Sequence, residues 1–146
     1  MADSAVLPIE FLEEIKDRGL LESSCPQDQV LSHPSIGVFL THCGWNSTIE
    51  SISSGVSLIC WPFFAELQAN CQYACVEWGI GVEVNKGVKR QEIEAIINDM
   101  LEGEKGKELK DKALEWKKKA AEATDIEGSS WKRFDAFLEK HLLSRE

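Results

Sequence analysis

The stretch "IGVFLTHCGWNSTIESISSGVSLICW", residues Ile36–Trp61, decides the fold of this chain. It opens with a nearly unbroken apolar run, which predicts a strand covered on both faces, as in a parallel sheet. A second apolar run, Val56–Trp61, predicts another buried strand, which Pro62 stops. The residues between the two runs have helical potential, and Gly55 is placed to end that helix. The stretch therefore predicts a strand–helix–strand unit with a right-handed crossover.

The same alternation continues on both sides of this unit. Downstream, residues 66–78 predict a helix and residues 79–84 predict a shorter, less buried strand. Upstream, residues 19–23 are a candidate first strand, entered from a helix around residues 9–16. The pattern of buried runs followed by helices indicates an α/β fold built on a parallel sheet.

The last third of the chain is predicted to be helical. Apolar residues recur there at spacings of three and four, as on one face of a helix. Polar breaks separate three such stripes, and the last stripe includes Phe134 and Phe137. We expect one α/β domain over residues 1–122, followed by a C-terminal helix over residues 123–146.

Charge is distributed unevenly along the 146 residues. The chain has 25 acidic and 16 basic residues, for a formal net charge of -9. Between residues 32 and 88 the only charged side chains are those of Glu50, Glu66, Glu77, Glu83 and Lys86. The middle is therefore expected to form the core. The acidic balance argues against nucleic acid or an anionic membrane surface as a partner.

Targeting signals and cysteine use suggest a compartment. The first 20 residues contain no apolar segment of the kind that a signal peptide needs, and no apolar run approaches the ~20 residues of a membrane helix. The five cysteines are an odd number and lie mostly among apolar residues. These features favour free thiols in a reducing cytoplasm over a disulfide framework.

Three polar segments follow predicted strands: residues 23–27, 41–47 and 61–67. Ligands of open parallel sheets bind at the carboxyl ends of the strands. These segments hold most of the polar residues in the charge-poor middle, so they are the candidate binding site.

A catalytic pair or a metal centre fits the middle segment poorly. His42 and Cys43 are neighbours and would point to opposite faces of a strand, which argues against a nucleophile–base pair. Cys71 and Cys75 lie one helical turn apart, but the cysteines lack the close sequence pairs of a zinc site.

Two other interpretations of the same segment remain open together. Ser47 and Glu50 fit the S-x-x-E pattern of a helix capping box. A buried strand, a tight glycine turn and a helix start also make a phosphate cradle, because the first helical N–H groups have no partner. His42 would add a donor to that cradle.

Residues Ser24–Leu67 resemble the signature box of plant UDP-dependent glycosyltransferases, the family-1 enzymes of secondary metabolism. The flanking sequences resemble the group that glucosylates cyanohydrins and terpenoids, so the resemblance spans essentially the whole chain. It implies the two-domain GT-B fold, of which this chain would be a partial, Rossmann-like C-terminal domain that lacks the first βα units. The intact family transfers glucose from UDP-glucose to a small-molecule hydroxyl.

The resemblance implies a phosphate-binding group of residues in the middle segment. His42 would donate to the diphosphate, and Asn46 and Ser47 would add contacts at the helix start. Gly44 would allow the backbone to approach the phosphates.

It also implies contacts to the ribose and the sugar. Gln27 would touch the ribose, and Glu50 would accept hydrogen bonds from its hydroxyls. Trp45 and Glu66 would border the sugar. The donor UDP-sugar is then a substrate, and no cofactor or metal is implied.

The box departs from the family pattern at three positions. Ser24 replaces a Trp that stacks on uracil, Leu67 replaces a Gln that binds sugar hydroxyls, and Ser57 replaces a Pro. The first two changes remove a stacking surface and a hydrogen-bonding side chain. We therefore expect weak binding of UDP and UDP-glucose.

The family's general base, a His of the acceptor domain, has no counterpart among His33, His42 and His141. We expect a donor-binding unit that is inactive as an isolated chain. A non-catalytic nucleotide-binding or protein-interaction module derived from such an enzyme is the alternative. An open sheet edge or the C-terminal helix would then support a homo-oligomer or a partner.

Overall fold

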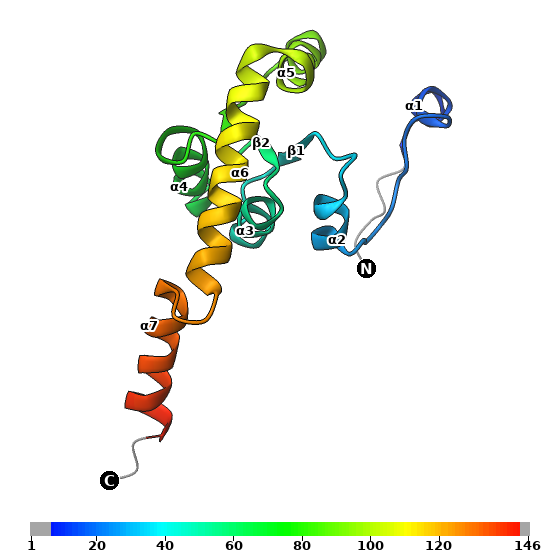
Figure 1. Ribbon diagram of the computed structural model, residues 1–146. Helices are drawn as coiled ribbons and strands as arrows, with labels where there is room; N and C mark the ends of the chain where they lie inside the picture. The colour runs from blue at the N-terminus through cyan, green and yellow to red at the C-terminus, as the bar shows by residue number, and fades with distance from the viewer. Residues whose placement is uncertain (1–6, 144–146) are drawn as a thin grey trace.

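The computed structural model describes residues 7–143, which fold around a three-stranded parallel sheet in the order β1-β2-β3 (Figure 1). The strands are β1 (Val38–Thr41), β2 (Ser57–Cys60) and β3 (Gly81–Glu83). Phe39 of β1 is level with Leu58 of β2, which in turn is level with Gly81 of β3. The predicted parallel α/β fold is confirmed, and its strands lie within the predicted ranges.

Helix α3 (Trp45–Ser54) makes the predicted crossover between β1 and β2. Gly55 ends it in the left-handed conformation, with φ 69°, and its N–H bonds to the carbonyls of Ser51 and Ile52. Glycine adopts this conformation without the steric cost that a Cβ brings. Helix α4 (Glu66–Gln72) continues as a π-helical turn, η1 (Tyr73–Glu77), and leads to β3.

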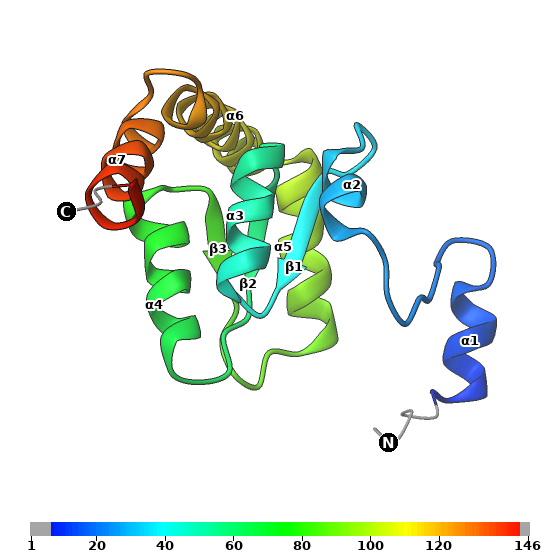
Figure 2. The same cartoon turned by 90° about the horizontal axis from the view of Figure 1, so that it is seen from below.

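Side chains of β2 alternate between two buried faces, as a doubly covered strand requires. Leu58 and Cys60 belong to the core beneath α3 and α4, whereas Ile59 belongs to the core beneath α5 (Arg90–Glu102). Figure 2 shows α3 and α4 on one side of the sheet and α5 on the other. All four residues of β2 are buried, and the last three, Leu58, Ile59 and Cys60, are apolar, whereas the first is Ser57.

Helix α6 (Glu104–Thr124) crosses the domain and contributes Leu109 and Ala113 to the two cores. Helix α7 (Ser129–Leu138) and a π-helical turn, η2 (Glu139–Leu143), extend from its end (Figure 1). Phe134 and Phe137 of α7 are 59% and 53% exposed. Apolar residues at helical spacing therefore lie uncovered on this helix, and the proposed division at residue 122 stays a prediction.

The predicted strand at residues 19–23 is wrong. Helix α1 (Ile9–Ile15) lies at the periphery, where Glu14 pairs with Arg90 of α5 at 2.8 Å, and an extended, unpaired segment joins it to α2 (Gln27–Ser32). Leu20 is 83% exposed, and no strand of the described chain lies beside it. A strand needs a hydrogen-bonding neighbour, and this segment has none.

The five cysteines are free thiols, as expected from their number and surroundings. Within residues 7–143, no helix combines the length and the apolar character that crossing a membrane requires.

Candidate functional site

The N-terminus of α3 presents unpaired backbone donors at the carboxyl end of β1. The helix begins at Trp45 with Gly44 as its N-cap, and no side chain caps it. Its first backbone bond runs from the N–H of Thr48 to the carbonyl of Gly44, at 3.0 Å. The N–H groups of Trp45, Asn46 and Ser47 have no acceptor among the described residues. Such a helix start suits an anion.

The capping-box interpretation of Ser47 and Glu50 is wrong. Ser47 is the third residue of the helix rather than its cap, and Glu50 lies in the second turn. Gly44 takes the cap position because the chain turns into the helix directly after the strand.

His42 lies beside this helix start. A Cβ added to Gly44 would meet the Nε2 atom of His42 at 2.6 Å, so the imidazole packs against the glycine backbone. Position 44 must therefore be Gly for the ring to lie there. His42 is exposed, whereas Cys43 is only 1% exposed. This agrees with the expectation that the two side chains point in opposite directions.

The turn that carries His42 is held in an unusual conformation. Cys43 has φ 70°, a value that favours glycine. Its N–H bonds to the Oγ1 of Thr41 at 3.1 Å, and its carbonyl accepts a bond from the side-chain amide of Asn70 at 2.9 Å. Ala65, just before α4, also has a positive φ of 47°. Strained backbone of this kind gathers at functional sites.

A hydrogen-bonded cluster lies along the α2–α3 contact. Nε2 of Gln27 donates to Oγ of Ser47 at 3.1 Å and to Oε2 of Glu50 at 2.7 Å. All three residues are half-buried. Gln27 is thus brought to two other predicted site residues, Ser47 and Glu50, which lie 20 and 23 residues further along the chain.

Trp45 and Glu66 lie apart from that cluster. Trp45 is 56% exposed and borders a shallow apolar pocket of about 220 Å³ with Trp78 and Trp116. Glu66 is the exposed first residue of α4 and makes no hydrogen bond or ion pair within the described chain. Their roles beside a sugar stay predictions.

The two degenerate positions of the box have different surroundings. Ser24 is exposed in the segment that enters α2. Leu67 is 6% exposed and packs into the core beneath α3 and α4. Its side chain is therefore part of the core, not of the polar site.

Asn70 is a residue beside the candidate site that the sequence analysis did not single out. It is a half-buried polar residue on α4, and its bond to Cys43 fixes the turn that carries His42. The signal was present, since the residues around it, from Leu67 to Ala74, supply buried apolar side chains.

Comparisons with known proteins identify the family of the chain. The family described as "UDP-glucoronosyl and UDP-glucosyl transferase" matches residues 13–114. UDP-glycosyltransferase 85A8 of Stevia rebaudiana is 59% identical over 143 residues, which cover 98% of this chain and 30% of that protein. Linamarin synthase 1 of Manihot esculenta is 57% identical over 146 residues, which cover 100% of this chain and 30% of that protein. The chain thus spans about 30% of the length of these relatives.

Solved structures give the same result. Os79 from O. sativa, in complex with UDP and deoxynivalenol-3-glucoside, matches with a TM-score of 0.88 at 35% identity, over 92% of this chain and 32% of that one. TcCGT1 in complex with UDP matches with a TM-score of 0.86 at 36% identity, over 91% of this chain and 30% of that one. The chain belongs to the UDP-glycosyltransferase family, in which it corresponds to the C-terminal, donor-binding region of the GT-B fold.

Proposed function

We propose that this chain binds UDP and UDP-glucose at the N-terminus of α3, with the diphosphate on the free N–H groups of Trp45, Asn46 and Ser47. The observation that carries the proposal is the placement of these donors beside His42 at the end of β1. The positive end of the helix dipole and the imidazole would both favour negative charge there. Solved relatives that hold UDP support the same ligand.

The ribose of the nucleotide would bind at the neighbouring hydrogen-bonded cluster of Gln27, Ser47 and Glu50. Glu50 uses one carboxylate oxygen to accept from Gln27, at 2.7 Å. Its other oxygen has no partner in the described chain and is assigned to the ribose hydroxyls. Gln27 keeps Glu50 in place and also contacts Ser47, so the nucleoside and phosphate regions share one network.

Binding by the isolated chain should be weak. Ser24 is exposed and has no ring on which uracil can stack. Base stacking on an aromatic side chain is worth ~1–3 kcal/mol, and this contribution is missing.

In glucosyl transfer, the same groups would act on the leaving group. As the anomeric carbon is attacked by an acceptor hydroxyl, negative charge grows on the departing UDP, and His42 and the helix start would stabilise it. These donors would stabilise the negative charge of the diphosphate, so the proposal assigns no metal ion to this site.

Deprotonation of the acceptor hydroxyl needs a base elsewhere. His33 is exposed and accepts a bond from the N–H of Ser35, while His141 packs on Phe137 with ring centroids 5.0 Å apart. Neither is placed at the α3 start, so the isolated chain should bind the donor without transferring sugar. We place this activity in the cytoplasm, where the five free thiols stay reduced.

Calorimetric titration with UDP, with His42→Ala and a matched His33→Ala variant, tests the proposal. Loss of a hydrogen bond to a charged group costs about 1.5–3 kcal/mol, so His42→Ala should weaken binding by roughly tenfold or more. His33→Ala should bind like the wild type. Equal UDP affinity of His42→Ala and wild type would contradict the proposal, as would measurable glucose transfer to a simple alcohol.

A further inference from the structure

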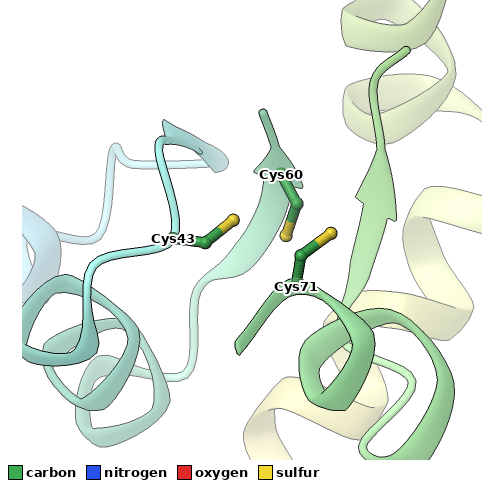
Figure 3. A group of neighbouring side chains, drawn as sticks. All are labelled: Cys43, Cys60 and Cys71. Carbon is green, nitrogen blue, oxygen red and sulfur yellow. The ribbon is translucent and has the colours of Figure 1, made fainter. Parts of the chain in front are cut away.

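Three buried thiols converge between the sheet and α4. Cys43 follows β1, Cys60 ends β2 and Cys71 lies on α4, yet their Sγ atoms are all within 4.8 Å of one another (Figure 3). In Figure 3 the Sγ atom of Cys60 lies between those of Cys43 and Cys71. The three residues are 1%, 0% and 2% exposed.

The spacing of the sulfurs is close to that of a metal–thiolate site. A zinc–sulfur bond is about 2.3 Å long, so the sulfurs around one ion lie roughly 3.8–4.0 Å apart. The limit of 4.8 Å among these atoms means that closing onto an ion needs movements of less than about 1 Å. Rotation about the side-chain bonds supplies that.

The backbone around the thiols supplies a second, independent observation. Cys43 holds φ 70°, where a side chain other than Gly or Asn costs roughly 1–2 kcal/mol. Hydrogen bonds from Asn70 and to Thr41 keep it there, and the thiol is thereby directed into the cluster. A glycine would satisfy the turn at lower cost but would bring no sulfur.

Cys75 lies between the buried thiols and solvent. It lies on η1, one turn after Cys71, and the two Sγ atoms are 3.9 Å apart. Cys75 is half-buried, unlike the other three. The π-helical turn that carries it is a rare conformation that recurs at functional sites.

Charge and softness select the class of ion. The cluster is lined by apolar side chains such as Leu67 and Ile80, so a large net charge is costly there. Three thiolates around a divalent ion leave one negative charge, whereas a monovalent ion leaves two. Thiolate is a soft ligand that favours zinc and related ions over magnesium or calcium.

We propose that Cys43, Cys60 and Cys71 form a binding site for a soft divalent cation of the zinc class, with Cys75 as the thiol through which the ion enters. Binding links the end of β1, the end of β2 and helix α4. The thiols lose their protons to solvent as the three sulfur–metal bonds form, so no oxidant or reductant takes part.

Each thiol that bonds to the ion must first lose its proton, so the number of protons released counts the ligand thiols. Hydrogen bonds with Cys43 and Cys75, together with burial, raise the pKa of Cys60. Burial, followed by the charge of neighbouring groups, raises the pKa of Cys71. The hydrogen bond from Cys60 lowers the pKa of Cys43, although burial opposes it.

The test titrates the reduced full chain with Cd²⁺, free of oxygen, and follows the ultraviolet charge-transfer absorbance of cadmium thiolate. We expect saturation at one ion per chain, release of between two and three protons per ion near neutral pH, and competition by Zn²⁺. The melting temperature should rise with Cd²⁺, because the ion binds the folded state. These wild-type measurements need no variant to fold. Absence of a saturable band, or release of one proton or none, overturns the proposal.

Variants then assign the ligands. Cys43→Ala, Cys60→Ala and Cys71→Ala should each lose more than about 100-fold in Cd²⁺ affinity, since even outer-shell changes cost 10–100-fold. Cys25→Ala is the matched control, because Cys25 is an exposed, isolated thiol, and it should bind like the wild type. Cys75→Ala should load more slowly and keep its affinity within about threefold. If Cys71 and Cys75 prove necessary and a folded Cys43→Ala variant binds normally, the ion sits on a helical surface pair and the proposal fails.

Discussion

The side-chain amide of Asn70 donates a 2.9 Å hydrogen bond to the backbone carbonyl of Cys43 and so ties α4 to the turn between β1 and α3. That turn carries His42 and leads directly into the free N–H groups at the start of α3. A residue of a neighbouring helix thus fixes the geometry of the candidate diphosphate site without being part of it.

Asn70→Ala should therefore impair both stability and binding. It leaves the half-buried Cys43 turn without its partner, which costs about 1–3 kcal/mol of the free energy of unfolding. UDP binding should weaken at temperatures at which the variant is still folded. Urea unfolding and calorimetry measure the two effects. Gln68→Ala, on the exposed side of the same helix, is the control and should change neither.

Leu67→Gln, which restores the family residue, should destabilise the fold. Leu67 is 6% exposed and lies in the core, so an amide there loses its water without gaining a partner. The expected cost is about 1–3 kcal/mol in urea unfolding. Leu67→Met preserves volume and should cost less than about 1.5 kcal/mol. Equal stability of Leu67→Gln and wild type would show that the Gln side chain reaches the polar site instead.

Ser24→Trp should tighten the binding of both UDP and UDP-glucose by up to roughly tenfold, which corresponds to ~1.4 kcal/mol. Ser24 is exposed just before α2, so a large ring can be placed there without repacking the core. Ser23→Trp adds the same ring one residue earlier and should leave the affinity unchanged. Calorimetry that finds equal gains for both variants would point to non-specific contact.

Self-association should increase with concentration. Strand β1 pairs only with β2 among the described residues, and its Leu40 is 45% exposed. Unpaired strand edges favour contact between chains. Light scattering on wild type, Leu40→Lys and Phe137→Lys would locate the surface: loss of association in the first variant assigns the strand edge, and loss in the second assigns α7. A wild-type monomer at high concentration would contradict the prediction.

The sheet was predictable where burial alone defines a strand. Both faces of β2 are covered, so its apolar run carries the signal locally, whereas β1 was expected to be covered on both faces and instead leaves Leu40 45% exposed. Residues 19–23 have a similar local pattern but no neighbouring strand, and pairing cannot be read from the segment itself.

The candidate site was predictable only in part, and for a different reason. Gln27, Ser47 and Glu50 were identified by resemblance, and their mutual hydrogen bonds depend on how α2 packs against α3. The thiol cluster was missed because Cys43 follows β1 whereas Cys60 ends β2, and only the parallel pairing of the two strands brings their sulfurs together. The spacing of cysteines in the sequence reveals metal sites that lie within one loop or helix, but it does not reveal sites whose ligands come together across a sheet.

The edge of β1 that no described residue pairs with also makes the chain a candidate acceptor for a strand supplied by a second polypeptide. Val38–Thr41 offers a row of backbone donors and acceptors on the side away from β2. A separately expressed polypeptide that supplies a matching parallel strand could dock there and cover Leu40. If the two polypeptides were each fused to one half of a split reporter protein, assembly of the sheet would restore the reporter, and its signal could be screened in cells.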